Sequence, residues 1–100
     1  MKKLISGIML FLYAGVLHAA NYYWTSGTGN WSNFASHWAT SSGGTTFHSA
    51  PPGPSDDVFF DANSFLNAGD TVYVDVANAF CKNFDWTGSA NNPVFTSSLN

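Results

Sequence analysis

The sequence is short of several residue types that most folded domains use. Beyond residue 20 it contains no Glu, Gln, Ile, Met or Arg and only two Leu, so most strong helix formers are missing. The apolar residues that remain are mainly Val and aromatics, which suit half-buried strands. Ser, Thr, Asn and Gly are abundant in the same region. The composition therefore predicts an all-β domain with long polar loops.

Basic charge is also scarce. Without its first 20 residues the chain keeps only Lys82 against six aspartates, a formal charge of −5, and Arg occurs nowhere. A nucleic-acid-binding surface needs basic side chains that neutralise phosphates. Anionic membrane surfaces attract the same basic residues. We therefore expect neither nucleic-acid binding nor electrostatic binding to anionic membranes.

Cys81 is the only cysteine, so the chain cannot form an internal disulfide. We interpret Cys81 as a small apolar residue buried in a strand, with a bond to a cysteine of another chain as the alternative. A domain this short without disulfides buries only about 60% of its unfolded surface and is marginal alone. The last residues, "NNPVFTSSLN", stop within a strand pattern. We therefore expect residues 21–100 to be the incomplete start of a longer repeat protein.

The first 20 residues have the organisation of a secretory signal peptide. Lys2 and Lys3 form a basic start, residues 4–16 are almost wholly apolar, and Ala19 and Ala20 are small residues at a cut site. The apolar run is shorter than the roughly 20 residues that a transmembrane helix needs. We predict that residues 1–20 are removed on export from a bacterium, leaving a mature chain without a membrane span. That chain begins at Ala20 or Asn21.

Strands are predicted wherever apolar and polar residues alternate between turn signals. The candidates are residues 21–25, "DDVFFDA" (56–62), "TVYVDV" (71–76), "FCKNFDW" (80–86) and "VFT" (94–96). Residues 31–38 are expected to contain one helical turn with Ser32 as its N-cap, and residues 39–55 are expected to form a loop. Strands thus recur about every 10–13 residues, a rhythm found in sandwiches, barrels and solenoids.

Tryptophan is unusually regular near the predicted mature start. Trp24, Trp31 and Trp38 are seven residues apart, but the intervening glycines exclude one continuous helix. These residues, with Trp86 further on, are either buried in the core or exposed as a platform that stacks on sugar rings. Burial is favoured, because large aromatics gain much from it and few other residues could fill the core.

The aspartates offer weak candidates for metal binding. Asp56, Asp57 and Asp61 lie close to Asn63, and such oxygen ligands suit Ca²⁺. The chain has no Glu that could supply a bidentate ligand, and each Asp also suits a turn. We expect no metal site and no cofactor, with Ca²⁺ at these residues as the alternative.

No catalytic constellation stands out. Asp61 and Asp75 are the candidate pair of carboxylates for glycoside hydrolysis, but nothing in the sequence places them across a cleft. There is no G-x-S-x-G motif for a nucleophilic serine. His37 and His48 lack the partners of a zinc site, and His37 is interpreted as a packed or hydrogen-bonded residue. We expect a non-enzymatic protein.

Four segments in order resemble a known class of module. "YYWTSGTGNWSNFASHW", "PPGPSDDVFFDANSF", "TVYVDV" and "FCKNFDWTG" together resemble the N-terminal module of large adhesin-like proteins of the bacterial cell surface, which use type IX secretion. A looser resemblance links them to autotransporter-associated β-strand repeats, which share the Trp-rich opening and a Thr-Val-x-Val strand. The resemblance covers residues 21–100.

The resemblance implies a fold and a function. It implies the N-terminal cap and first coils of a right-handed parallel β-solenoid. The strand rhythm leaves a small β-sandwich as the alternative fold. The module would be exported or displayed at the cell surface, with downstream repeats of the same protein as its partner and no catalytic residues. The alternative function is a carbohydrate-binding module that holds extracellular glycans with exposed Trp and Tyr. A third alternative function, with the least support in the sequence, is a fragment of an enzyme such as a β-helix lyase.

Overall fold

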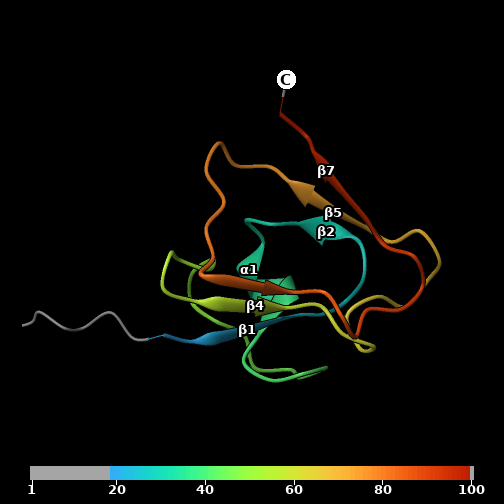
Figure 1. Cartoon of the computed structure of the whole chain (residues 1–100), viewed down its shortest axis with the longest axis horizontal. Coiled ribbons are helices and arrows are strands. Elements are labelled where there is room, and N and C mark those ends of the chain that lie inside the picture. Colours follow the sequence, from blue (N-terminus) through green and yellow to red (C-terminus); the bar gives the residue numbers. More distant parts are fainter. Residues whose placement is uncertain (1–18, 100) are drawn as a thin grey trace, which may run out of the picture.

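A computed structural model describes residues 19–99, and its regular structure is mostly β-strand (Figure 1). The all-β prediction is therefore confirmed for this part of the chain. The signal peptide predicted for residues 1–20 lies outside it, apart from Ala19 and Ala20. The elements in chain order are β1 (Asn21–Trp24), β2 (Gly29–Asn30), α1 (Phe34–His37), β3 (Trp38–Ala39), β4 (Asp57–Phe59), β5 (Thr71–Val74), β6 (Asn83–Asp85) and β7 (Val94–Ser97).

The strands form two sheets, and apart from β3 the chain alternates between them. One sheet has the order β3-β1-β4-β6 and the other has the order β2-β5-β7. Every neighbouring pair is parallel except β1 and β3, which are antiparallel. Three tiers result, each with one strand in each sheet: tier 1 is β1 with β2, tier 2 is β4 with β5, and tier 3 is β6 with β7. Figure 1 shows the tiers side by side in chain order.

The buried side chains follow the alternation that the sequence predicted. Val58 in β4 and Phe60 just after it are both buried, while Phe59 between them is only half-buried. Val72 in β5 is buried and its neighbour Tyr73 is exposed, because successive strand residues point to opposite faces. The core lies between the two sheets and consists of Tyr22, Trp24, Trp31, Trp38, Val58, Phe60, Phe65 and Val72.

Two short strands lie where the sequence predicted only turn or loop. β2 occupies the glycine turn, where Trp31 N–H donates to Tyr73 O at 2.8 Å and continues the pairing with β5. β3 covers the last residue of the predicted helical turn and the first of the predicted loop, and Ala39 bridges to Phe47 inside that loop. Neither segment has an alternating pattern, and both are extended because another part of the chain provides hydrogen-bond partners.

Two boundaries in the predicted elements are wrong. The helical turn α1 has Asn33 at its N-cap, without a side-chain capping bond. Ser32 does not cap it, because the Ser32 hydroxyl donates to Asp75 of tier 2 instead. The strand predicted for residues 80–86 is limited to residues 83–85, with Phe80 outside it and exposed.

Candidate functional site at the open end of the sheets

Both sheets end at tier 3 on the same side of the molecule. β6 is the last strand of one sheet and β7 is the last strand of the other. Within residues 19–99, no further strand pairs with the outer edge of either one. An edge strand presents backbone groups that another strand can pair with. The two edges together make this end of the fold the candidate site, which we call the open end.

Side chains that share a register position become more exposed toward the open end. Tyr22, Val58 and Phe84 occupy one position in tiers 1, 2 and 3. Tyr22 is 6% exposed and Val58 is 0% exposed, whereas Phe84 is 47% exposed. The other sheet behaves in the same way, since Val72 is fully buried and its partner Phe95 is 37% exposed. The apolar columns of the core therefore continue into tier 3 but are not covered there.

Three aromatic side chains of tier 3 form a cluster at the open end, which we call the end cluster. It consists of Phe84, Trp86 and Phe95. The Phe84 and Trp86 ring centroids are 5.8 Å apart, and the Trp86 and Phe95 centroids are 5.2 Å apart, with the latter rings nearly perpendicular. Buried Phe60 lies 4.9 Å from Trp86 and supports the cluster from tier 2. Clustered exposed aromatics mark a contact surface, whereas single ones need no explanation.

The backbone of β7 also has free groups on this side. Val94 N–H donates to Asp70 O at 2.8 Å and Ser98 N–H donates to Val74 O at 3.1 Å, so these amides face tier 2. Alternate residues of a strand direct their backbone groups to opposite edges. The N–H groups of Phe95 and Ser97 therefore face away from tier 2, toward the open end.

The other end of the first sheet is covered. β3 pairs antiparallel with the outer edge of β1, with Tyr23 opposite Ala39 and Trp24 opposite Trp38. An antiparallel strand that turns back on the first tier closes an edge that a further parallel strand would otherwise extend. The two ends of this sheet thus differ: tier 1 is covered and tier 3 is open.

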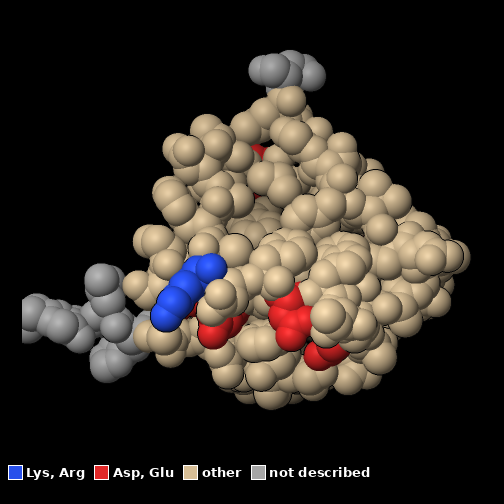
Figure 2. Space-filling view, viewed as in Figure 1, with Lys and Arg blue, Asp and Glu red and all other residues tan. Residues whose placement is uncertain are grey.

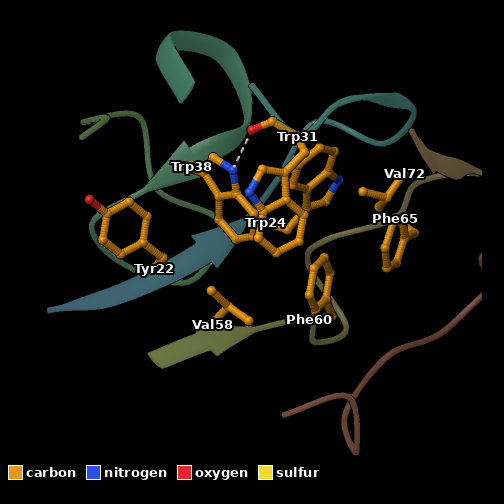
Figure 3. Close-up of a cluster of buried hydrophobic side chains, with 8 residues drawn as sticks. All are labelled: Tyr22, Trp24, Trp31, Trp38, Val58, Phe60, Phe65 and Val72. Carbon is orange, nitrogen blue, oxygen red and sulfur yellow. Dashed lines mark hydrogen bonds between the residues drawn. The ribbon is translucent and has the colours of Figure 1, made fainter. Parts of the chain in front are cut away.

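The three regularly spaced tryptophans meet behind this covered edge (Figure 3). Trp38 lies between the other two, with ring centroids 5.0 Å from Trp24 and 4.9 Å from Trp31. Trp38 Nε1–H donates to Trp31 O at 2.9 Å, and Trp24 Nε1–H donates to Gly27 O at 2.8 Å. All three are buried, whereas Trp86 is only half-buried in the end cluster. Their exposure does not suit a sugar-stacking platform.

The two tyrosines next to the tryptophans differ in exposure. Tyr22 is buried and stacks on His48 with ring centroids 3.6 Å apart. Burial, with a contribution from Asp56, raises the pKa of the Tyr22 phenol. Tyr23 is half-buried and stacks on Phe59 of tier 2. Of the aromatic side chains around tier 1, Tyr22 and the three tryptophans are buried, and Tyr23 is only partly accessible.

Each residue of the weak calcium set binds groups of the protein itself. Asp57 Oδ1 accepts from Asn83 Nδ2–H at 2.8 Å, and Asp61 Oδ2 accepts from the Ser42 hydroxyl at 2.6 Å. Asn63 N–H donates to Asp61 Oδ1 at 2.9 Å. Both oxygens of Asp56 accept from backbone N–H groups. Among residues 19–99 no three His, Cys, Asp or Glu side chains gather as a metal site.

Two carboxylates that tie the tiers together were not singled out for that role by the sequence. Asp70 is nearly buried, and its Oδ2 accepts from the N–H groups of Leu66 and Asn67, both at 2.9 Å. Its Oδ1 accepts from the Thr28 hydroxyl of the tier 1 turn at 3.3 Å. Asp75 accepts from both the N–H and the hydroxyl of Ser32. Their tier 1 partners, Thr28 and Ser32, are more than 40 residues away in sequence, so no local pattern could have identified these two contacts.

The pKa of Asp75 gives a testable pH dependence. Burial alone would raise this pKa, but hydrogen bonds from the Ser32 hydroxyl and N–H outweigh it and lower the pKa. A lowered folded-state pKa contributes stability above the unfolded value of about 3.9, and that stability is lost as pH falls through the folded value. We expect Ser32→Ala to lower the free energy of unfolding near neutral pH, with the difference from wild type shrinking as pH falls below about 4.

Urea unfolding at several pH values, followed by circular dichroism, measures this difference. Ser36→Ala is the matched control, because Ser36 is an exposed serine in the same turn. A Ser32→Ala deficit that stays constant between about pH 6 and about pH 2.5 would show that the Asp75 bond does not contribute as described.

Cys81 and His37 are two further reactive side chains, and neither is fully exposed. Cys81 is a free, half-buried thiol just before β6, and burial, with a contribution from Asp57, raises its pKa. His37 is buried as a packed residue, with Nδ1 2.7 Å from Thr25 O and its ring stacked on Trp24. The face in Figure 2 is mostly uncharged, with a few acidic groups and a small basic region.

Comparisons with protein-family models, with curated proteins and with solved structures found no match to this chain. Within residues 19–99, no helix has the length and apolar character needed to cross a membrane.

Proposed function

We propose that this chain is a non-enzymatic, exported structural module that caps and starts a parallel β-solenoid of the bacterial cell surface. In this proposal each tier is one coil, and β3 with the buried tryptophans forms the cap. The chain order of strands in both sheets supports it, since a solenoid adds one strand to each sheet per coil. The resemblance of the four sequence segments to adhesin-like modules points to the same role.

The observation that carries the proposal is the difference in side-chain exposure between the three tiers at one register position. Tyr22 and Val58 are covered by the tier that follows each of them, and Phe84 has the same position without a following tier. A solenoid coil cannot bury its own apolar face and needs a neighbour. The occupant that we propose for the open end is a further coil, whose strands add in parallel to β6 and β7.

An extended chain tests the proposal. A second copy of residues 56–81, which contain tier 2, is added after residue 100 to supply a fourth coil. We expect the Phe95 and Ser97 amides to exchange with deuterium more slowly than in the parent chain, because a parallel strand now accepts from them. The unfolding midpoint should also rise, as it does when a repeat array gains a neighbour.

The matched control carries Asp in place of the valines equivalent to Val58 and Val72 within the added copy. This copy has the same length but cannot bury its apolar column. Equal exchange rates at Phe95 and Ser97 in the two extended chains would count against coil addition at the open end.

The carbohydrate-binding alternative makes the opposite prediction about the tryptophans. A sugar platform needs accessible rings, so iodide would quench the fluorescence of most tryptophans and a bound glycan would protect them. With Trp24, Trp31 and Trp38 buried, we expect iodide to quench mainly the Trp86 contribution. Trp86→Phe should therefore remove most of the iodide-sensitive emission, and broad quenching in that variant would favour the glycan-binding function.

A further inference from the structure

We infer that the export leader is cleaved between Ala19 and Ala20, and that the carboxylate of Asp56 then binds the new amino group of Ala20. This inference rests on the signal peptide expected in residues 1–20, and it does not depend on the coil stack. The sequence leaves two cut positions open, because Ala19 and Ala20 are both small residues at the end of the leader. The folded domain makes contacts with Ala20, whereas Ala19 is exposed, and this difference favours the cut before Ala20.

Ala20 is part of the folded domain. Its carbonyl oxygen accepts from Asp57 N–H at 3.0 Å, which begins the pairing of β1 with β4. Its side chain is half-buried and packs against the core, whereas Ala19 is exposed. Cleavage after Ala20 would remove these contacts from the first strand, and cleavage before it keeps them.

Asp56 is already oriented toward the Ala20 nitrogen. Asp56 Oδ1 accepts from Ala20 N–H at 3.0 Å. Asp56 Oδ2 accepts from Gly53 N–H at 2.7 Å, within a turn in which Asp56 N–H donates to Gly53 O at 3.1 Å. Both carboxylate oxygens are thus directed by the backbone, so the group needs no rearrangement to receive a charged donor.

Cleavage changes the donor but keeps its position. An endopeptidase of the export machinery uses water to hydrolyse the Ala19–Ala20 bond: the C–N bond breaks, the hydroxyl joins the Ala19 carbonyl carbon, and a proton goes to the Ala20 nitrogen. With one further proton from solvent, the nitrogen becomes an ammonium group at neutral pH. A charged donor strengthens the bond to a carboxylate. The ammonium also adds a second cation to a mature chain that otherwise has only Lys82.

The cut position is tested on the full chain of 100 residues. The gene is expressed in a Gram-negative host, and the intact mass of the exported protein is measured. We expect a chain that begins at Ala20. A chain that begins at Asn21 would overturn the inference. An uncut chain would overturn it together with the expected signal peptide, while leaving the arrangement of the tiers untouched.

The pairing with Asp56 is tested by removing the charge of the new amino group. Acetylation of the Ala20 nitrogen keeps an N–H donor but removes the charge, and we expect it to lower the folded-to-unfolded ratio about threefold, as for a partly exposed ion pair. In Asp56→Asn the same acetylation should change the ratio by less than about 1.5-fold.

Asp57→Asn is the matched control, because the Asp57 carboxylate binds Asn83 and not Ala20. Acetylation should have its full effect in that variant. An equal loss in Asp56→Asn and Asp57→Asn would overturn the pairing, whatever the cut position.

Discussion

Replacement of Trp38 by Ala is expected to destabilise the domain by about 4 kcal/mol, the range for a large aromatic in a packed core. Trp38 is fully buried and contacts the rings of Trp24, Trp31 and Phe60. Its removal leaves a cavity behind the covered edge and takes away the donor to Trp31 O. A domain of this size has a total stability of about 4–12 kcal/mol, so much of the variant should be unfolded.

Urea unfolding followed by circular dichroism measures the loss in Trp38→Ala. Trp38→Phe is the first control, because it keeps a large ring and loses mainly the hydrogen bond; we expect about 1–2 kcal/mol. Trp86→Ala is the second control, because its half-buried ring has less surface to expose. A near-neutral Trp38→Ala variant would mean that the tryptophans do not form the cap.

Replacement of Gly29 by Ala is expected to cost about 3 kcal/mol through overpacking. A Cβ at this position would lie within 2.5 Å of His37 Cδ2 and Cε1 and closer still to Nε2. His37 cannot move away easily, because its ring stacks on Trp24 and its Nδ1 bonds to Thr25 O. The added methyl group should therefore disturb β2 and the edge it shares with β5.

A double variant separates this clash from an ordinary backbone effect. His37→Ala in the Gly29→Ala background removes the ring that the new methyl group meets. The loss of stability in the double variant should therefore be smaller than the sum of the two single losses, by about 1–3 kcal/mol. Gly88→Ala is the matched control, since its Cβ would meet Asp61 at an ordinary 3.4 Å, and we expect a change within about 0.5 kcal/mol. Strict additivity of the two changes would contradict the proposed contact.

The strands that alternate apolar and polar residues were predictable from the sequence alone. Val58 and Phe60 in one predicted strand segment and Val72 in another are buried, and their neighbours Phe59 and Tyr73 are more exposed. This succeeds because successive residues of a strand face opposite sides, a property of the backbone that needs no knowledge of the partner strand. The burial of the regularly spaced tryptophans also follows from their size and from the shortage of other core residues.

Other features were not predictable, because they depend on residues far apart in the chain. β2 and β3 have no strand pattern and are extended because tier 2 and β1 pair with them. Ser32 was expected to cap a helix, and it binds Asp75 instead, 43 residues further on. Local propensity describes what a segment can do, and tertiary contacts decide among the alternatives.

The sequence by itself determined the all-β class, the low basic charge and the burial of Trp24, Trp31 and Trp38, since composition and two-residue periodicity act locally. Only the tertiary structure decided that the three tiers pair in parallel in both sheets, that β3 covers one end of the first sheet and that Phe84 and Phe95 are exposed at the other end of the fold. The physical reason is that register and edge exposure are properties of paired strands, so no single segment encodes them.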